Sequence, residues 1–233
     1  MATAVKRTST RPKTSGATRV PLDRERIIAV GLELAAEPGS LSISVRELGT
    51  RLGTDPTAIY RHFRNKEQLM QALLDEVIHR SVIDVTADPA EWQERLRQLA
   101  AATLHHFVLY PAIAIEATVL TTQGPGELAA VELMLDAFSR AGLDEDEVVH
   151  QYALMASLVL STAAGIARAR GERAPVSGEK SPWIEGPLLA DPRKYPLVAS
   201  LAGKLADLED QTLFIFGVDA LIESAERRAA TPR

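Results

Sequence analysis

The feature that most constrains the fold of this chain is the segment RELGTRLGTDPTAIYRHFRNKEQLM, residues 46–70, in which a tight turn separates two short amphipathic stretches. The first stretch is predicted as a helix over residues 44–52, because it opens with a Ser-x-x-Glu capping box and stops at Gly53, a residue typical of helix ends. Asp55 then favours a new helix, with proline in its first position, over about residues 56–63. Two helices joined by a glycine-containing turn indicate a helix-turn-helix.

The two faces of the second helix differ in chemistry. Ile59 and Phe63 are four residues apart and are expected to point inward. The predicted core of the motif consists of Leu48, Leu52, Gly53, Ile59 and Phe63. The outward face carries Thr57, Tyr60 and Arg61, whose side chains can donate hydrogen bonds to phosphates and base edges. The pattern therefore favours double-stranded DNA as a partner, with a solvated, charged helical hairpin as the alternative.

The other periodic segments are also predicted as helices, and no segment reads convincingly as a strand. The predicted ranges are approximately 23–37, 66–81, 92–110, 112–120, 127–140, 144–169 and 208–228. Residues 170–196 are rich in glycine, proline and charge and are predicted as a mobile loop. The sequence thus predicts an all-α protein, with an N-terminal three-helix head that contains the helix-turn-helix and a C-terminal helical domain.

Charge is distributed unevenly along the chain. Residues 1–66 hold twelve Lys and Arg against six Asp and Glu, whereas residues 67–233 hold fourteen against twenty-five. A basic head on an acidic body favours a polyanionic partner for the head. Residues 1–20 contain five cations and no acid, together with many threonines, and are predicted as a disordered basic tail.

Composition argues against several classes of function. The chain has no cysteine, which removes disulfides, thiolate nucleophiles and Cys-type zinc sites. It also lacks a glycine-rich phosphate loop and a Ser-His-Asp context, so neither an enzyme nor a cofactor is expected. His105 and His106 are neighbours on a predicted helix, where their side chains diverge by about 100° and make a poor chelate. No metal site is predicted.

A membrane span is the alternative interpretation of residues 148–167, an uncharged run of twenty residues. The run includes His150, Gln151 and several serine, alanine and glycine residues, so we expect a buried or interface helix and no membrane partner. The basic, polar first twenty residues do not resemble a signal peptide. We therefore expect a cytoplasmic protein.

The segment SVRELGTRLGTDPTAIYRHFRNKEQLMQALL resembles the DNA-binding motif of the TetR family of bacterial repressors, and the similarity extends over roughly residues 23–78. The resemblance implies DNA contacts by Arg46, Pro56, Thr57, Ala58, Tyr60, His62 and Lys66. Thr57 and Ala58 would face bases, because their methyl groups suit a thymine methyl. Tyr60, His62 and Lys66 would mostly contact phosphates. A structural histidine and a packing tyrosine are the alternatives for His62 and Tyr60.

The body resembles the tetracycline-repressor type of C-terminal domain, through Trp92, Tyr110-Pro111 and LFIFGVDALIESAERR near the end. This implies a homodimer in which the long helix and the last helix form a four-helix bundle, with Val159, Phe216 and Ala220 as interface residues. Single buried core helices are the alternative. The expected division is a tail at 1–20, a DNA-binding domain at 21–81 and an effector-binding and dimerisation domain at 82–233.

The same resemblance implies a small-molecule cavity inside the body. Its candidate lining residues are Leu99, Thr103, His106, Tyr110, Tyr152 and Met155, each of which has an alternative role in the core. The chain departs from the tetracycline repressor where that protein presents polar drug ligands, since Val82, Leu99 and Thr103 stand there. We therefore expect a largely apolar effector and not tetracycline with magnesium.

The leading hypothesis is a ligand-responsive, homodimeric repressor that binds a palindromic operator and is released by its effector. It would act in the bacterial cytoplasm, associated with the nucleoid. The alternative is a helical protein-interaction scaffold with a basic head. Salt separates the two, because phosphate-driven binding falls steeply with salt concentration.

Overall fold

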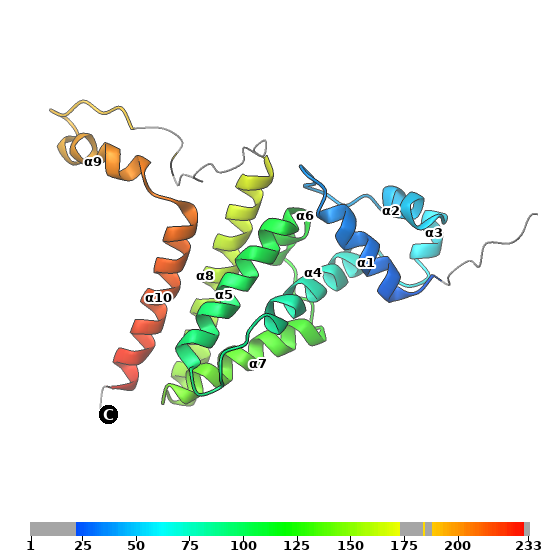
Figure 1. Cartoon of the computed structure of the whole chain (residues 1–233), viewed down its shortest axis with the longest axis horizontal. Helices are drawn as coiled ribbons and strands as arrows, with labels where there is room; N and C mark the ends of the chain where they lie inside the picture. Colours follow the sequence, from blue (N-terminus) through cyan, green and yellow to red (C-terminus); the bar gives the residue numbers. More distant parts are fainter. Residues whose placement is uncertain (1–21, 173–183, 185–187, 231–233) are drawn as a thin grey trace, which may run out of the picture.

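The structure is a computed structural model that describes residues 22–172, 184 and 188–230. Helices dominate these residues and no strand occurs among them, as the sequence predicts (Figure 1). The predicted tail at 1–20 and much of the predicted loop at 170–196 lie outside the described residues. The helices are α1 Arg24–Ala35, α2 Val45–Leu52, α3 Pro56–Ile59, α4 Lys66–Ile83, α5 Trp92–Leu109, α6 Pro111–Ala114, the 3₁₀ helix η1 Ile115–Thr118, α7 Pro125–Arg140, α8 Glu145–Glu172, α9 Pro196–Ala206 and α10 Asp210–Ala229.

Side-chain caps define the helix starts of the head, which comprises α1, α2, α3 and the beginning of α4. Asp23 accepts a hydrogen bond from the amide of Arg26 at 2.8 Å, and Ser44 accepts one from the amide of Glu47 at 3.4 Å. Gly53 ends α2 with φ of 65°, a left-handed conformation that glycine adopts without strain. These local signals explain why the start of α2 and its end match the sequence prediction.

Asn65 fixes the start of α4, because its side-chain oxygen accepts a hydrogen bond from the amide of Gln68 at 2.8 Å. We expect Asn65→Ala to destabilise the protein by about 1 kcal/mol, the usual effect of losing such a cap. The thermal midpoint should fall by roughly 2–4 °C in a calorimetric scan. Asn65→Asp keeps an acceptor at the same position and serves as the control; equal loss in both variants would contradict the capping role.

The second helix of the helix-turn-helix, α3, which we call the recognition helix, is shorter than predicted. α3 ends at Ile59 and not near Phe63, and the following residues form a tight turn in which the amide of His62 donates to the carbonyl of Ile59 at 2.9 Å. Asn65 caps the next helix, α4, two residues after Phe63, so the chain leaves the path of α3 before that point, while Phe63 stays buried at 1% exposure.

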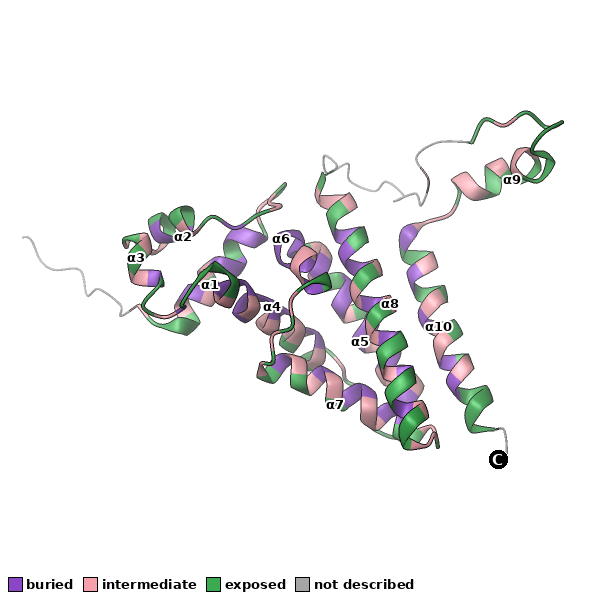
Figure 2. Ribbon diagram, turned by 180° about the vertical axis from the view of Figure 1, so that it is seen from behind, coloured by how far each residue is buried: buried purple, intermediate pink, exposed green. Residues whose placement is uncertain are grey.

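The body is built around α5 and α8, which pack along each other, with α7 against α4 and α10 against α8 (Figure 1). α4 belongs to both parts of the molecule, since its first turns pack on α1 and its later turns contact α5 and α7. The predicted division at residue 81 therefore falls within the last turn of α4. Figure 2 shows the buried residues along the facing sides of these helices. Head and body are joined by a continuous helix.

A long-range cap holds α7 against α4. The carboxylate of Asp75, on α4, accepts hydrogen bonds from the amide of Gly126 at 3.1 Å, the amide of Glu127 at 3.0 Å and the hydroxyl of Thr122 at 2.7 Å. A carboxylate at a helix start satisfies amides that lack a partner within the helix and interacts favourably with the helix dipole. Asp75 therefore fixes the position of α7 relative to the helix that carries the head.

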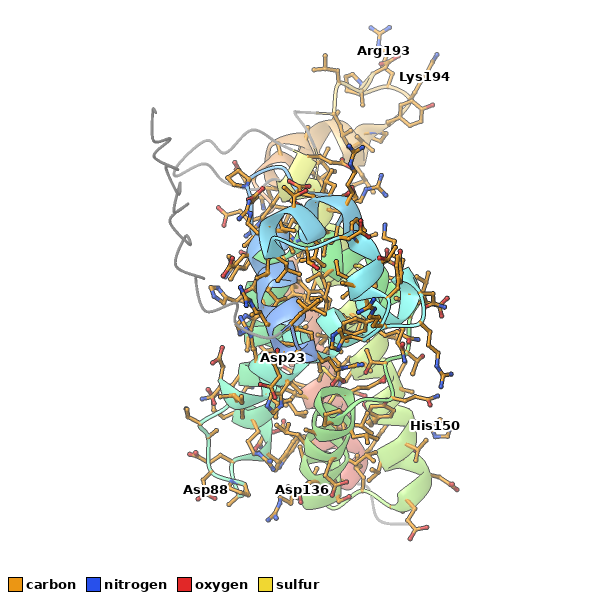
Figure 3. All side chains as sticks on the ribbon, turned by 90° about the vertical axis from the view of Figure 1, so that its right-hand side faces the viewer. Asp23, Asp88, Asp136, His150, Arg193 and Lys194 are labelled. Carbon is orange, nitrogen blue, oxygen red and sulfur yellow. The ribbon has the colours of Figure 1, made fainter. Side chains whose placement is uncertain are left out.

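Two parts of the chain differ from the predicted helices. Residues 112–120, predicted as one helix, form the short α6 and then η1, after Pro111 opens α6 at its first position. α9 was not predicted; it begins at Pro196 and has no buried residue, with Leu197 exposed at 74%. Figures 1 and 2 show α9 standing apart from the other helices, and Arg193 and Lys194 before it point outward in Figure 3.

α8 is long and apolar enough to cross a membrane by length and composition. In this fold it packs along α5 and contacts α6, η1, α7 and α10. Its buried residues are Val148, Gln151, Met155, Val159, Ala163, Ala164, Ile166 and Ala167. These contacts are those of a central helix of the body.

Candidate nucleic-acid interface and internal cavities

The helix-turn-helix places most of its predicted core residues inward. Leu48, Ile59 and Phe63 are buried, whereas Leu52 is half-buried and Gly53 is exposed in the turn. Gly53 serves the motif through its backbone conformation and not through burial. The guanidinium of Arg24 lies 4.5 Å from the centre of the Phe63 ring, so α1 also covers this core.

The opposite surface of the head carries the residues predicted to contact DNA. Arg46, Thr57, Tyr60 and Lys66 are exposed, and the remaining three predicted residues, Pro56, Ala58 and His62, are half-buried. Tyr60 is 44% exposed although it is large and aromatic. An exposed aromatic side chain with a hydroxyl group is suited to a partner that offers both packing and hydrogen bonding.

Several cations of the head are available to a partner. Arg51 forms an ion pair with Glu37. In the part of the chain that the structure describes, Arg46, Arg61, Arg64 and Lys66 make no ion pair within 4 Å, and all four are exposed. Exposed cations that form no ion pair within the described residues are available to attract a polyanion to this side of the head.

Asp55 orients the first residues of α3. Its carboxylate accepts hydrogen bonds from the amide of Thr57 at 2.8 Å and from the hydroxyl of Thr57 at 2.6 Å. These two bonds lower the pKa of Asp55, with the hydroxyl as the larger cause, so the cap stays charged at neutral pH. The hydroxyl proton of Thr57 is thereby engaged within the head, which leaves its methyl group and its oxygen lone pairs for a partner.

Four of the six predicted effector-site residues line one internal cavity of about 70 Å³. These are Leu99 and Thr103 on α5 with Tyr152 and Met155 on α8. The cavity is mostly apolar, and the hydroxyl of Thr103 donates to the carbonyl of Leu99 at 2.8 Å. Ile78 on α4 also lines it, which brings the helix that carries the head to the wall of the cavity.

The other two predicted lining residues lie outside this cavity. His106 places its Nε2 at 2.8 Å from a carboxylate oxygen of Asp84, and the hydroxyl of Tyr110 accepts a hydrogen bond from Arg80 at 2.9 Å. The prediction followed the spacing along α5, but the last turns of α5 face the end of α4. There Arg80 and Asp84, four residues apart, engage both side chains.

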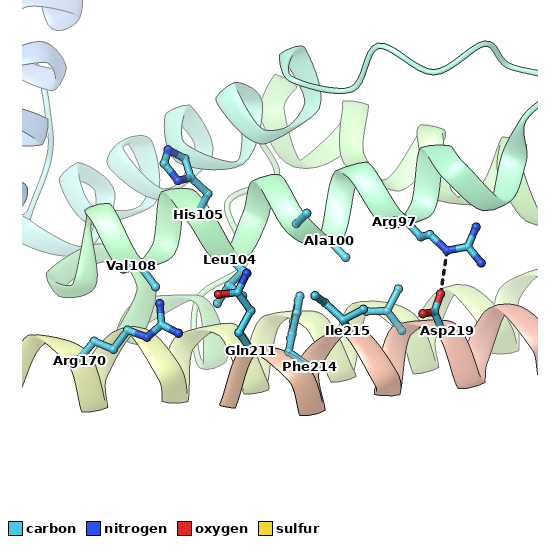
Figure 4. A pocket seen from close by; sticks show the side chains of 12 residues that line it. Arg97, Ala100, Leu104, His105, Val108, Arg170, Gln211, Phe214, Ile215 and Asp219 are labelled. Carbon is cyan, nitrogen blue, oxygen red and sulfur yellow. Dashed lines mark hydrogen bonds and ion pairs between the residues drawn. The ribbon is translucent and has the colours of Figure 1, made fainter. Parts of the chain in front are cut away.

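A second cavity, of about 310 Å³, lies on a neighbouring face of α5 (Figure 4). It is lined by Arg97, Ala100, Ala101, Leu104, His105 and Val108 of α5, by Arg170 of α8 and by Gln211, Phe214, Ile215, Val218 and Asp219 of α10. This cavity was not predicted from the sequence. The i, i+4, i+7 spacing along α5 is present in the sequence, but it does not distinguish a cavity wall from a packed helix face.

The three residues predicted at a dimer interface lie in different environments. Phe216 is 71% exposed and Ala220 is also exposed, on the same side of α10. Val159 is only 7% exposed and lines the smaller cavity, so its side chain faces the core of its own chain. The prediction for Val159 is corrected accordingly, because α5 and α7 cover that side of α8.

Comparison with known families agrees with this two-part architecture. The family model described as bacterial regulatory proteins, tetR family, matches residues 27–73, and the model described as tetracyclin repressor-like, C-terminal domain, matches residues 86–228. The chain belongs to the TetR family. As a TetR-family regulator it is a DNA-binding transcriptional regulator and not an enzyme, as the sequence analysis expected.

Individual relatives support the assignment over most of the chain. The HTH-type transcriptional repressor Rv1353c of Mycobacterium tuberculosis is 26% identical over 216 residues, which cover 90% of this chain and 82% of that protein. Tetracycline repressor protein class G of Vibrio anguillarum is 35% identical over 80 residues, 34% of this chain and 38% of that protein. Among solved structures, the Streptomyces coelicolor TetR family protein ActR in complex with actinorhodin has a TM-score of 0.73 at 21% identity, covering 91% of this chain and 100% of that chain.

Proposed function

We propose that this TetR-family regulator is a homodimeric repressor, which binds a palindromic operator through residues 21–81 and is released when a small, largely apolar effector enters residues 82–233. The observation that carries the proposal is the recognition surface of the head. It combines a capped helix start, an exposed tyrosine and four exposed cations without an ion pair in the described part of the chain. The protein would act in the bacterial cytoplasm, on the nucleoid.

Within the recognition surface, some residues would contact bases and others would contact phosphates. Thr57 and Ala58 begin α3 and would face the bases, with Pro56 beside them, because methyl groups suit a thymine methyl. Arg46 at the start of α2, together with Tyr60, His62 and Lys66, would hold phosphates. Lys66 is the first residue of α4, where backbone amides also favour an anion.

Salt dependence tests the nature of the interaction and also separates the repressor from a protein-interaction scaffold. If each head neutralises several phosphates, log K should fall linearly with log salt, with a slope of about −0.9 for each phosphate contact. A slope near zero, or tight binding to a protein partner at salt concentrations that abolish DNA binding, would favour the scaffold. A random-sequence duplex measured in parallel gives the non-specific contribution.

The dimer would form between the exposed sides of α8 and α10. Phe216 and Ala220 lie on that side of α10, and exposed residues of α8, including Leu154, Ser161 and Gly165, form a matching stripe. Gly217 lies close to Leu158, so α10 and α8 of one chain approach each other closely there. Two such pairs would give a four-helix bundle. A large exposed phenylalanine beside an apolar stripe is typical of an interface.

Phe216→Glu should dissociate this dimer, because a carboxylate in an apolar interface loses its hydration without gaining a partner. We expect a monomer by analytical ultracentrifugation at concentrations where the unmodified protein is a dimer, and loss of high-affinity operator binding. Leu128→Glu is the matched control, since Leu128 on α7 is 62% exposed. If the Phe216→Glu variant stays dimeric and binds DNA with normal affinity, this face of α10 is not part of the dimer interface.

The size of the smaller cavity suggests how an effector would act. About 70 Å³ is well below the roughly 300 Å³ at which typical ligand pockets begin, so an effector would favour a conformation in which the cavity is wider. Ile78 of α4 is part of the wall, and α4 continues into the head. Moving α4 changes the position of the recognition helix relative to the dimer partner's, so an effector-bound dimer would no longer match the operator spacing.

A further inference from the structure

The larger cavity has the dimensions of a ligand site in its own right. Its volume of about 310 Å³ lies within the range of small-molecule pockets, and it is more than four times that of the cavity that holds the predicted effector residues. Ala100 is the one residue that lines both cavities. The two spaces thus lie on neighbouring faces of α5, and one can be filled without filling the other.

Apolar side chains from two helices face each other across the larger cavity, although charged and polar residues also line it. α5 contributes Leu104 and Val108, and α10 contributes Phe214, Ile215 and Val218. Phe214 is buried, whereas Ile215 is 48% exposed at the opening. An aromatic ring and branched aliphatic side chains on facing helices form a slot that suits a flat, apolar body.

Each end of the slot carries a guanidinium group. The Nε of Arg97 lies 2.7 Å from a carboxylate oxygen of Asp219 (Figure 4). Arg170 is paired with Asp210 at 2.6 Å. Val108, near Arg170, follows Arg97 by eleven residues of helix, which corresponds to roughly 16 Å. The slot is therefore long enough for a molecule with two or three fused or linked rings.

Arg97 has further N–H groups that can donate hydrogen bonds to a ligand. A guanidinium has five N–H groups, and in the described part of the chain only the Nε–H of Arg97 is engaged, with Asp219. The remaining donors can bind a carboxylate, sulfonate or phenolate with two parallel hydrogen bonds. Asp219 keeps the guanidinium in place through its hydrogen bond with Nε, and the two terminal nitrogens stay available to a ligand.

We propose that this cavity, between α5 and α10, is a second ligand site for a flat aromatic anion. The aromatic body lies between Leu104 and Phe214, and the acidic group binds Arg97. The site is distinct from the effector cavity of the proposed function. Its test is direct binding of a probe and involves no DNA, so the two proposals fail independently.

The experiment uses the full chain and two fluorescent probes. 1-Anilinonaphthalene-8-sulfonate carries the aromatic body and the anion, and N-phenyl-1-naphthylamine carries the same body without the sulfonate. Ala101→Trp fills the slot from an exposed position of α5, and Ala29→Trp makes the same change on an exposed position of α1. Val131→Phe narrows only the smaller cavity.

The expected result is saturable binding of the sulfonate probe, weakened at least tenfold by Ala101→Trp and unchanged by Ala29→Trp and Val131→Phe. Arg97→Gln should weaken the sulfonate probe about tenfold and leave the neutral probe unaffected, because only the anion uses the guanidinium. The proposal is overturned if the unmodified protein does not bind the sulfonate probe, if Ala101→Trp binds it normally, or if Val131→Phe abolishes binding instead. Equal effects of Arg97→Gln on both probes would overturn the assignment of an anion.

Discussion

Replacing Tyr60 and Lys66 together by alanine is expected to weaken DNA binding at least a hundredfold, on every sequence alike. Both side chains are exposed on the recognition side of the head. Lys66 forms no ion pair in the described part of the chain. A hydrogen bond to a charged group contributes about 1.5–3 kcal/mol, and two of them account for a loss of this size. Because phosphates carry no sequence information, specific and non-specific duplexes should lose affinity by similar factors.

The dependence of DNA affinity on salt concentration provides a second, independent test of the same double variant. Removing one lysine that neutralises a phosphate should reduce the slope of log K against log salt by about 1 for each head. Tyr195 and Lys204, both exposed and outside the head, provide the matched double alanine control. If Tyr60→Ala/Lys66→Ala binds DNA as tightly as this control, with the same slope, the recognition surface has been placed wrongly.

Gly126→Ala should be the most destabilising single methyl addition in the body. A Cβ at Gly126 would overlap the main-chain oxygen of Asp75 and would also crowd His79, both on α4. A backbone atom in the middle of a helix cannot move aside as a flexible side chain can. The substitution therefore has to push α7 away from α4 and break the hydrogen bonds that Asp75 makes to the start of α7.

The expected loss is about 3 kcal/mol, the upper part of the range for overpacking, which corresponds to a fall of roughly 6–12 °C in the thermal midpoint. Gly203→Ala is the control, because Gly203 lies in α9 with no atom near its added methyl group. That change should be neutral or stabilising, since alanine favours helix over glycine by about 1 kcal/mol. A Gly126→Ala protein as stable as Gly203→Ala would contradict the close contact between α4 and α7.

The head could be predicted in detail because its signals are local. The side chains of Asp23, Ser44, Asp55 and Asn65 each accept a hydrogen bond from an amide two or three residues further along, so the helix starts follow from short sequence patterns. The end of α3 was the exception. The residues between Ile59 and the Asn65 cap of α4 form a tight turn, which the inward spacing of Ile59 and Phe63 did not reveal because a continuous helix would bury the same two side chains.

The body could be predicted as helical, but its sites depend on contacts between distant residues. The cap that Asp75 gives to α7 joins residues about fifty positions apart. Arg97 and Asp219 form an ion pair and line a cavity whose walls come from α5 and α10, two helices that are far apart in the sequence. Leu99 and Thr103 line the smaller cavity, whereas His106 lies beside Asp84, the residue that follows α4.

The central claim is that the protein is a sequence-specific regulator whose head binds one operator as a dimer. The most direct measurement is fluorescence anisotropy of the full chain against tiled duplexes from the intergenic DNA upstream of its own gene and from the neighbouring operons, at two salt concentrations. The proposed function predicts tight, salt-sensitive binding to a palindromic tile, with two chains bound to each duplex. Weak binding of equal strength to all tiles would contradict it.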